Sequence, residues 1–190
     1  MFTTLFRTLL TPLSGLVLLM VITRNHAWTP SHHLPDASLA IFFLSGLRFR
    51  SRGVFAGLLL LAGGIDALVI GSGAVSGICL TPAYALLAPA YASAWLGGCW
   101  LASQREWSGP LSILRLIGVL FTVGVLAECL ASGGFYFFGG SFAHPSLLGF
   151  IPRFIQYVPH TLLSLVVYTG LWLGVSQRFT PSFKSPSPVL

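Results

Sequence analysis

The sequence predicts an all-α membrane protein, a bundle of six transmembrane helices with both termini in the cytoplasm. Of its 190 residues, 55% are hydrophobic and only 7% are charged, whereas soluble domains carry roughly 25% charged residues. The mean hydropathy is +0.85, and long apolar runs recur along the chain. We expect one transmembrane domain over residues 1–178 and a flexible, Pro/Ser-rich tail over residues 179–190.

The spans follow from apolar runs near the length of about 20 residues that crosses a bilayer. We expect them at residues 5–23, 37–47, 54–70, 81–103, 111–138 and 155–176. The second run is short and spans only if its polar flanks also enter the membrane. The third contains Asp66, and a carboxylate within a membrane is costly unless it is paired or wet. Asp66 is therefore either a ligand contact in a water-filled cavity or a helix-packing hydrogen-bond partner.

The orientation follows from the basic residues, which concentrate on the cytoplasmic side of membrane proteins. With the N-terminus inside, Arg24 and Arg153 lie outside. The inner side collects Arg7, Arg48, Arg50, Arg52, Arg105, Arg115, Arg178 and Lys184. The outward segments are then residues 24–35, the stretch around Cys79, and residues 139–153. The net charge of +6 is explained by this topology, and no nucleic-acid partner is expected.

Polar and small residues inside the spans predict helix packing. Glu128, deep in the fifth span, is expected to pair with Arg115 or with a serine of a neighbouring helix. Three small-residue pairs allow close helix approach. They are Gly53 with Gly57, Ala90 with Ala94, and Gly170 with Gly174.

Cys79 stands apart from the other two cysteines. Cys99 and Cys129 lie in regular apolar helix, where free cysteine behaves as a small hydrophobe. Cys79 lies in the glycine-broken stretch GSGAVSGICLTPAYALLAP, residues 71–89. Irregular backbone at membrane depth is tolerated where it lines a cavity, and a thiolate is a soft metal ligand. Cys79 is therefore a candidate ligand or nucleophile, with a plain structural role as the alternative.

The histidines do not predict a metal or haem centre. A transmembrane haem of the b type needs two histidines that face each other from within helices. His26, His32, His33 and His144 lie in loops, and only His160 begins a helix. The cysteines show no CxxC spacing, so a zinc site or a dithiol of neighbouring cysteines is not expected either.

The chain resembles the BtuM family, the cobalamin-specific S-components of energy-coupling-factor (ECF) vitamin transporters. The residues that carry the resemblance are GGIDALVIGSGAVSGICLTPAYALLAP with its cysteine, the loop RNHAWTPSHHLPD, and PRFIQYVPH at the start of the last helix. The resemblance implies a six-helix S-component in the inner (cytoplasmic) membrane of a bacterium. It implies that the chain binds cobalamin, vitamin B12, for uptake.

By the same resemblance, Cys79 is the axial ligand of the cobalt, and Asp66, Tyr84, Arg153 and His32 are candidate contacts to the corrinoid. Ligation by Cys79 would displace cyanide from cyanocobalamin, and the sequence leaves open whether this is catalytic. The chain lacks GxxxxGK[ST], so ATP hydrolysis would belong to partner ATPases. An ECF transmembrane coupling subunit is the other implied partner.

Two features keep alternatives open. Many S-components dock through AxxxA in the first helix, but the first alanine here is Ala27, and Thr11 with Gly15 gives the nearest small-residue spacing. The usual docking on the coupling subunit is therefore in doubt. The second functional candidate is a haem- or quinone-linked redox subunit, or another membrane enzyme, that uses His160 and Glu128.

Overall fold

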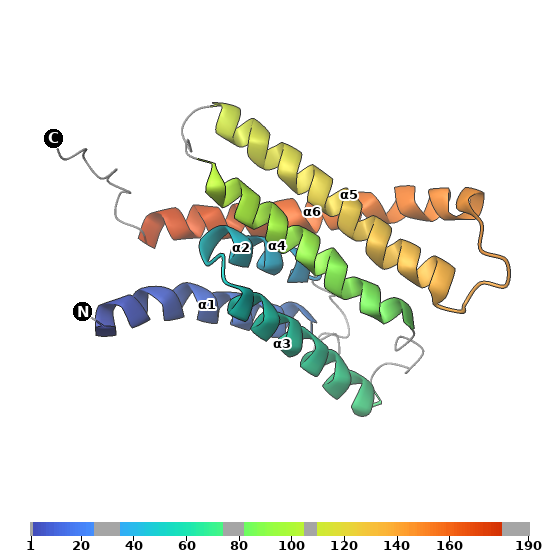
Figure 1. Ribbon diagram of the computed structural model, residues 1–190, viewed down its shortest axis with the longest axis horizontal. Coiled ribbons are helices and arrows are strands. Elements are labelled where there is room, and N and C mark those ends of the chain that lie inside the picture. Colours follow the sequence, from blue (N-terminus) through green and yellow to red (C-terminus); the bar gives the residue numbers. More distant parts are fainter. Residues whose placement is uncertain (1, 25–34, 74–81, 105–109, 180–190) are drawn as a thin grey trace.

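The protein is an all-helical bundle (Figure 1). The computed structural model describes the backbone of residues 2–24, 35–73, 82–104 and 110–179, and the side chains of residues 12–24, 35–73, 83–104 and 111–175. This part of the chain contains no strand and forms α1 (Phe2–Arg24), α2 (Ser38–Arg48), α3 (Arg52–Gly71), the 3-10 helix η2 (Pro82–Leu86), α4 (Leu87–Ser103), α5 (Pro110–Phe138) and α6 (Leu147–Phe179). The expected all-α class is confirmed.

Four described segments are long and apolar enough to cross a membrane. They are Arg52–Gly71, Ala83–Ser103, Leu111–Phe138 and Leu147–Val175, which indicates a multi-pass membrane protein. The helix α2 has 11 residues, a length of about 16 Å at 1.5 Å per residue. It is therefore about half as long as the hydrocarbon core of a bilayer is thick.

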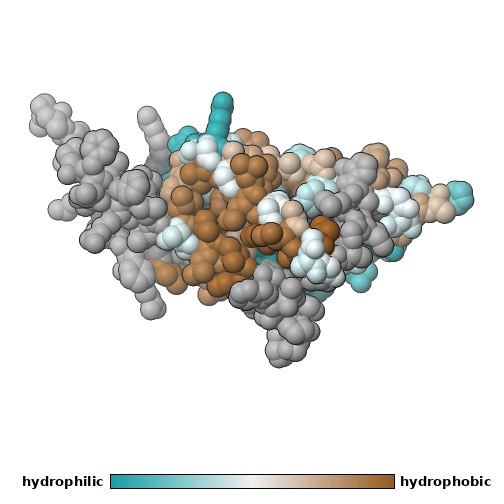
Figure 2. All heavy atoms as spheres, turned by 90° about the horizontal axis from the view of Figure 1, so that it is seen from below, coloured by the Kyte–Doolittle hydropathy of each residue, from teal (hydrophilic) through white to brown (hydrophobic). Residues whose placement is uncertain are grey.

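The outer surface of the bundle is apolar, as a lipid environment requires. Leu60 and Leu68 on α3 are 77% and 75% exposed, and Leu148 on α6 is 83% exposed. Figure 2 shows a broad hydrophobic area in the middle of one face. Exposing apolar side chains to water is unfavourable, whereas contact with lipid tails is not. The exposed faces of α3 and α6 are therefore suited to contact lipid tails.

The helices divide the charges between the two ends of the bundle. The start of α1 and the end of α6 lie at the same end (Figure 1). We call it the basic end, because the described arginines Arg48, Arg50, Arg52 and Arg115 belong to helix termini and turns there. The opposite end, the Arg24 end, holds Arg24 and Arg153. The described arginines that the sequence analysis assigned to the same side of the membrane thus lie at the same end of the bundle. That the basic end faces the cytoplasm stays a prediction.

The short helix α2 forms the centre of the bundle and lies against α4. Eight of its residues are buried, from Ser38 to Gly46. Gly46 faces the backbone carbonyl of Trp95 so closely that a Cβ atom would overlap it, and Gly98 faces the carbonyl of Phe43 in the same way. Only glycine permits this backbone-to-backbone approach. The contact of α2 with α4 is therefore the tightest helix pair described.

The expected small-residue pairs have different outcomes. Ala90 and Ala94 are buried, at 2% and 0% exposure, and with Gly98 they form one stripe on α4. In contrast, a Cβ on Gly57, Gly170 or Gly174 would meet no atom within 4 Å. The Gly53–Gly57 and Gly170–Gly174 pairs therefore bring no helices together among the described residues. Spacing alone does not reveal which face of a helix has a partner.

The last helix begins earlier than the sequence pattern predicts. The structure starts α6 at Leu147 and not at Ile155, and it accommodates Pro152 and Pro159 inside the helix. Prolines are tolerated within membrane helices because neighbouring groups satisfy the freed backbone. Arg153, which we expected in an outward loop, therefore projects from the second turn of α6.

The α2–α4 contact gives a stability prediction. Gly98→Ala should destabilise the protein by about 1–3 kcal/mol, the usual cost of overpacking, because the new methyl group overlaps the carbonyl of Phe43. Thermal unfolding in detergent measures the change. Gly170→Ala is the matched control and should leave the midpoint unchanged or slightly raised, since its methyl group meets open space. Equal midpoints for the two variants would contradict the described packing.

Candidate functional site

A buried arginine organises the polar residues at the Arg24 end. Arg24 is the last residue of α1, and it is only 7% exposed. Its guanidinium group connects residues from α1, α2, α3, η2 and α4. We call this set the Arg24 network, and its members are Arg24, Asp36, Ser38, Asp66, Tyr84 and Tyr91.

Asp66 is the main partner of Arg24. The Nε and Nη2 atoms of Arg24 donate to the two carboxylate oxygens of Asp66, each at 2.6 Å. This is the bidentate geometry that makes arginine–carboxylate pairs strong and directional. The hydroxyl group of Tyr84 donates to the Oδ2 atom of Asp66 as well. Asp66 thus accepts three hydrogen bonds and holds Tyr84 at the end of α3.

The third nitrogen of the Arg24 guanidinium group donates hydrogen bonds to the first residue of α2 and to a tyrosine of α4. Its Nη1 atom donates to Ser38 Oγ at 2.7 Å and to Tyr91 Oη at 2.8 Å. Asp36 accepts from the backbone N–H and from the hydroxyl group of Ser38, and it lies 3.6 Å from Arg24 Nη1. The Tyr91 ring stacks on Phe42 with centroids 4.5 Å apart. The network therefore satisfies the first backbone N–H of α2, that of Ser38, and holds its side chain.

A cavity of about 440 Å³ lies next to the network, between α2, α4, α5 and α6. We call it the central cavity. Asp36 and Tyr91 form one side of it, and Glu128 and His160 line it from α5 and α6. Glu128 is 8% exposed and accepts hydrogen bonds from Ser132 and, at 2.5 Å, from Thr161.

The environment of Glu128 differs from the expected one. The serine that donates to it belongs to the same helix, and the partner on the neighbouring helix is a threonine. Arg115 lies 13 residues earlier on α5, about 20 Å away along the axis, so the expected pairing with Arg115 is wrong. Glu128 still connects two helices, as expected, but its partner on the neighbouring helix α6 is Thr161.

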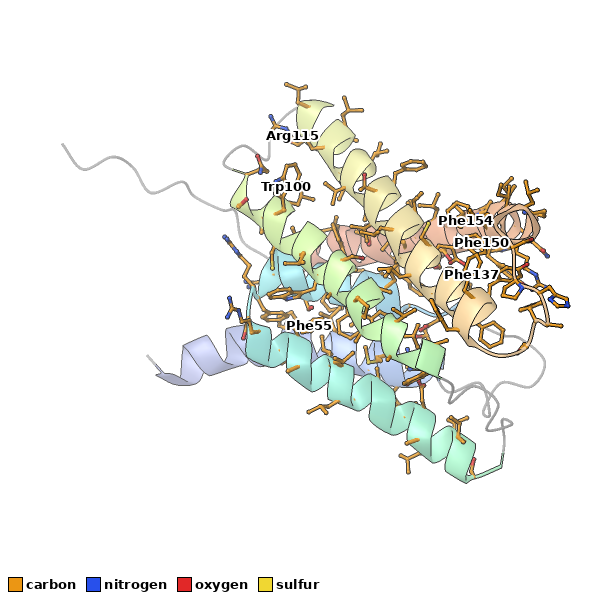
Figure 3. All side chains as sticks on the ribbon, turned by 45° about the vertical axis from the view of Figure 1, so that its right-hand side comes forward. Phe55, Trp100, Arg115, Phe137, Phe150 and Phe154 are labelled. Carbon is orange, nitrogen blue, oxygen red and sulfur yellow. The ribbon has the colours of Figure 1, made fainter. Side chains whose placement is uncertain are left out.

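Arg153 lies in a second pocket, of about 310 Å³, between α5 and α6. Its guanidinium carbon lies 4.4 Å from the centroid of the Phe142 ring and 5.9 Å from that of Tyr136. Phe150 lies among Phe137, Phe154 and Tyr136, each with ring centroids 5.7 Å from its own (Figure 3). We call this the aromatic pocket. Ala131 lines both it and the central cavity, so the two spaces are neighbours.

The candidate residues of the sequence analysis therefore fall into three groups. Asp66 and Tyr84 are in direct contact. Arg153 lies apart from them, beyond the central cavity. Cys79 and His32 lie outside the described residues, as do His26 and His33. Within the described residues, no group of three or more His, Cys, Asp or Glu side chains is placed to hold a metal ion.

The central member of the site, Arg24, was counted in the sequence analysis only for topology. A signal for it exists in the sequence. The chain has only four acidic residues, and an intramembrane carboxylate such as Asp66 needs a partner. The outward side offered two basic residues, Arg24 and Arg153, and Arg24 follows the first span at the same side of the membrane as the end of the third span, where Asp66 lies. Charge pairing therefore favoured Arg24, but nothing in the spacing identified Ser38 or Tyr91.

The arrangement combines a rigid polar network with two adjacent cavities at one end of an apolar bundle. Cavities of a few hundred Å³ with a few convergent polar groups are typical of small-molecule sites. The chain matches no protein-family model and no curated protein. Function is therefore inferred from these residues and from the resemblance described above.

The Arg24–Asp66 pair gives a second stability prediction. Asp66→Leu leaves the guanidinium group of Arg24 buried without its main partner, and such a loss costs about 3–5 kcal/mol. Tyr84→Phe removes one hydrogen bond to a charged group and should cost about 1.5–3 kcal/mol. Denaturant unfolding in detergent measures both changes.

The control is the double variant Arg24→Met/Asp66→Leu, which removes both charges. It should recover most of the stability lost in Asp66→Leu, because no uncompensated charge remains buried. If the double variant is as unstable as the sum of its single changes, the two side chains are not coupled and the network is wrong.

Proposed function

We propose that this chain is a substrate-binding membrane subunit for the uptake of cobalamin, and that the Cys79 thiolate binds the cobalt as an axial ligand. The vitamin enters at the Arg24 end. The chain contains no nucleotide-binding motif of the GxxxxGK[ST] type, so the energy for transport comes from partner ATPases, coupled through an ECF transmembrane subunit.

The observation that carries the proposal is the contact between Tyr84 and Asp66. These two residues are 18 positions apart, and in the sequence they stand on either side of Cys79. The resemblance nominates all three as part of one site. A direct hydrogen bond between two nominated residues supports this assignment, because the residues of one site must lie close together.

The same contact sharpens the role of Asp66. Its carboxylate already accepts two hydrogen bonds from Arg24 and one from Tyr84, which leaves little capacity for the amide groups of a corrinoid. Asp66 is therefore a positioning residue that fixes Tyr84 at the mouth of the site. The direct contacts fall to other groups, including Cys79 and the polar lining of the central cavity.

The proposed chemistry at Cys79 is a ligand exchange. The thiolate sulfur supplies the electron pair of a new cobalt–sulfur bond, and cyanide leaves with the electron pair of the cobalt–carbon bond. The oxidation state of cobalt does not change. A thiolate suits this role because sulfur is a soft donor that favours borderline and soft transition metals.

The alternative function, a haem- or quinone-linked redox subunit, has one observation in its favour. His160 and Glu128 line the same cavity. However, His160 is the one histidine among its described lining residues, and a haem of the b type held by two histidines needs a second ligand. A visible spectrum separates the two functions, because bound haem gives a Soret band and bound corrinoid gives a cobalamin spectrum.

The test of the proposal compares two cysteine variants. With cyanocobalamin added, wild-type protein should bind the vitamin at micromolar concentration and release cyanide. Cys79→Ala should change the visible spectrum of the bound vitamin and abolish cyanide release. Cys99→Ala, a change of a half-buried cysteine in α4, should do neither.

Each part of the proposal can fail separately. Wild-type protein that does not bind cobalamin would rule out the function as a whole. Binding with identical spectra in wild type and both variants would rule out cobalt ligation while leaving transport open. Transport itself is tested by rescue of growth in a B12-dependent bacterial strain that lacks its own importer.

A further inference from the structure

A groove that is larger than the central cavity and the aromatic pocket begins at the basic end and lies on the outer surface between α4 and α5. Its volume is about 650 Å³. Trp100 of α4 and Arg115 of α5 lie close to each other at the basic end of the groove (Figure 3). Gly97 and Gly118 also line it. Gly118 faces open space, whereas Gly97 lies against Val123 and allows α4 and α5 to approach closely at the base of the groove. The groove has no part in the proposed vitamin site.

The polar side-chain groups of the groove that have no hydrogen-bond partner among the described residues are the guanidinium group of Arg115 and the indole N–H of Trp100, which lie together at the basic end. Ser93 donates to the carbonyl of Ala90 at 2.7 Å, and Thr122 donates to the carbonyl of Gly118 at 2.9 Å. Both hydroxyl groups are thus satisfied by the backbone of their own helix. The rest of the lining is apolar, so the part of an occupant that lies along the walls must be apolar too.

Arg115 gives the groove one charged end. It is exposed, and among the described residues it forms no ion pair. It lies five residues after Pro110, where α5 begins, and Trp100 lies three residues before Ser103, where α4 ends. Arginine and tryptophan within about one turn of helix ends are typical of the membrane interface, where headgroups lie.

The length of the groove matches one leaflet. Its lining on α5 runs from Arg115 to Leu126, and the 11 steps between these residues span about 16 Å at 1.5 Å per residue. The hydrocarbon core of a bilayer is about 30 Å thick, so one leaflet contributes about 15 Å. The groove therefore extends from the interface to about the middle of the membrane.

We propose that this groove is a binding site for one anionic phospholipid of the leaflet at the basic end. The phosphate group pairs with Arg115, the glycerol region lies beside Trp100, and one acyl chain fills the apolar channel over Gly118. The exposed positive charge of Arg115 at the interface favours an anionic headgroup over a zwitterionic one, as basic pockets between membrane helices do.

The test measures quenching of Trp100 by lipids with brominated acyl chains. The protein is placed in bilayers that contain equal fractions of brominated phosphatidylglycerol or brominated phosphatidylcholine. Trp100→Phe provides the background from the other tryptophans, and the difference reports Trp100 alone. Wild type should prefer phosphatidylglycerol roughly fivefold, the effect expected of one arginine near an anionic headgroup.

Two variants and two matched controls define the site. Arg115→Gln should remove the preference, and Gly118→Leu should reduce quenching by both lipids, since a side chain there enters open space and fills the groove. Arg48→Gln removes a charge from the same end, and Gly64→Leu adds the same side chain to an open position on α3. Both controls should behave as wild type.

Three outcomes would overturn the proposal. They are equal quenching by the two lipids in wild type, an equal loss of preference in Arg48→Gln and Arg115→Gln, and unchanged quenching in Gly118→Leu. The second outcome would assign the preference to the overall charge of the basic end. Because Gly118→Leu and Arg115→Gln alter different parts of the groove, failure of one variant to fold leaves the other as a test.

Discussion

The buried ion pair between Arg24 and Asp66 is the interaction on which the polar end of the bundle depends. A guanidinium group at 7% exposure has lost most of its hydration, and only a complete set of partners offsets that cost. Arg24 obtains them from α2, α3 and α4, and Asp66 adds η2 through Tyr84. The requirement to satisfy one cation therefore fixes the relative positions of five elements.

The network also explains how a helix of 11 residues can occupy the centre of a membrane bundle. A helix this short exposes the N–H groups of its first turn within the thickness of the protein, where no lipid can satisfy them. Asp36 accepts from the N–H of Ser38, and Arg24 holds the Ser38 hydroxyl. Along its length, α2 is held by the glycine contacts with α4 at Gly46 and Gly98. Polar capping and close backbone packing together replace length as the source of its stability.

The sequence was sufficient to predict where single helices lie. It was insufficient to predict which residues of two different helices meet. Apolar runs placed the helices well, except for the start of α6, because Pro152 and Arg153 resemble loop residues until neighbouring helices are considered. The cost of an isolated carboxylate identified Asp66 as unusual. Its partner was not identified, since Arg24 lies 42 residues away. The small-residue spacing of Gly170 and Gly174 was indistinguishable from that of Ala90 and Ala94, although only the second pair packs inside the bundle.

The two ends of the bundle differ in whether their charged side chains are buried and hydrogen-bonded or exposed. At the Arg24 end, the charges of Arg24, Asp66 and Glu128 are largely buried and hydrogen-bonded, so they shape cavities and hold side chains such as Tyr84 in place. At the basic end, Arg115 is exposed and forms no ion pair with the described residues. A buried charge whose hydrogen bonds are complete stabilises geometry, as Arg24 does for Asp66 and Ser38. In the lipid site that we propose, an exposed arginine has the different task of binding a headgroup.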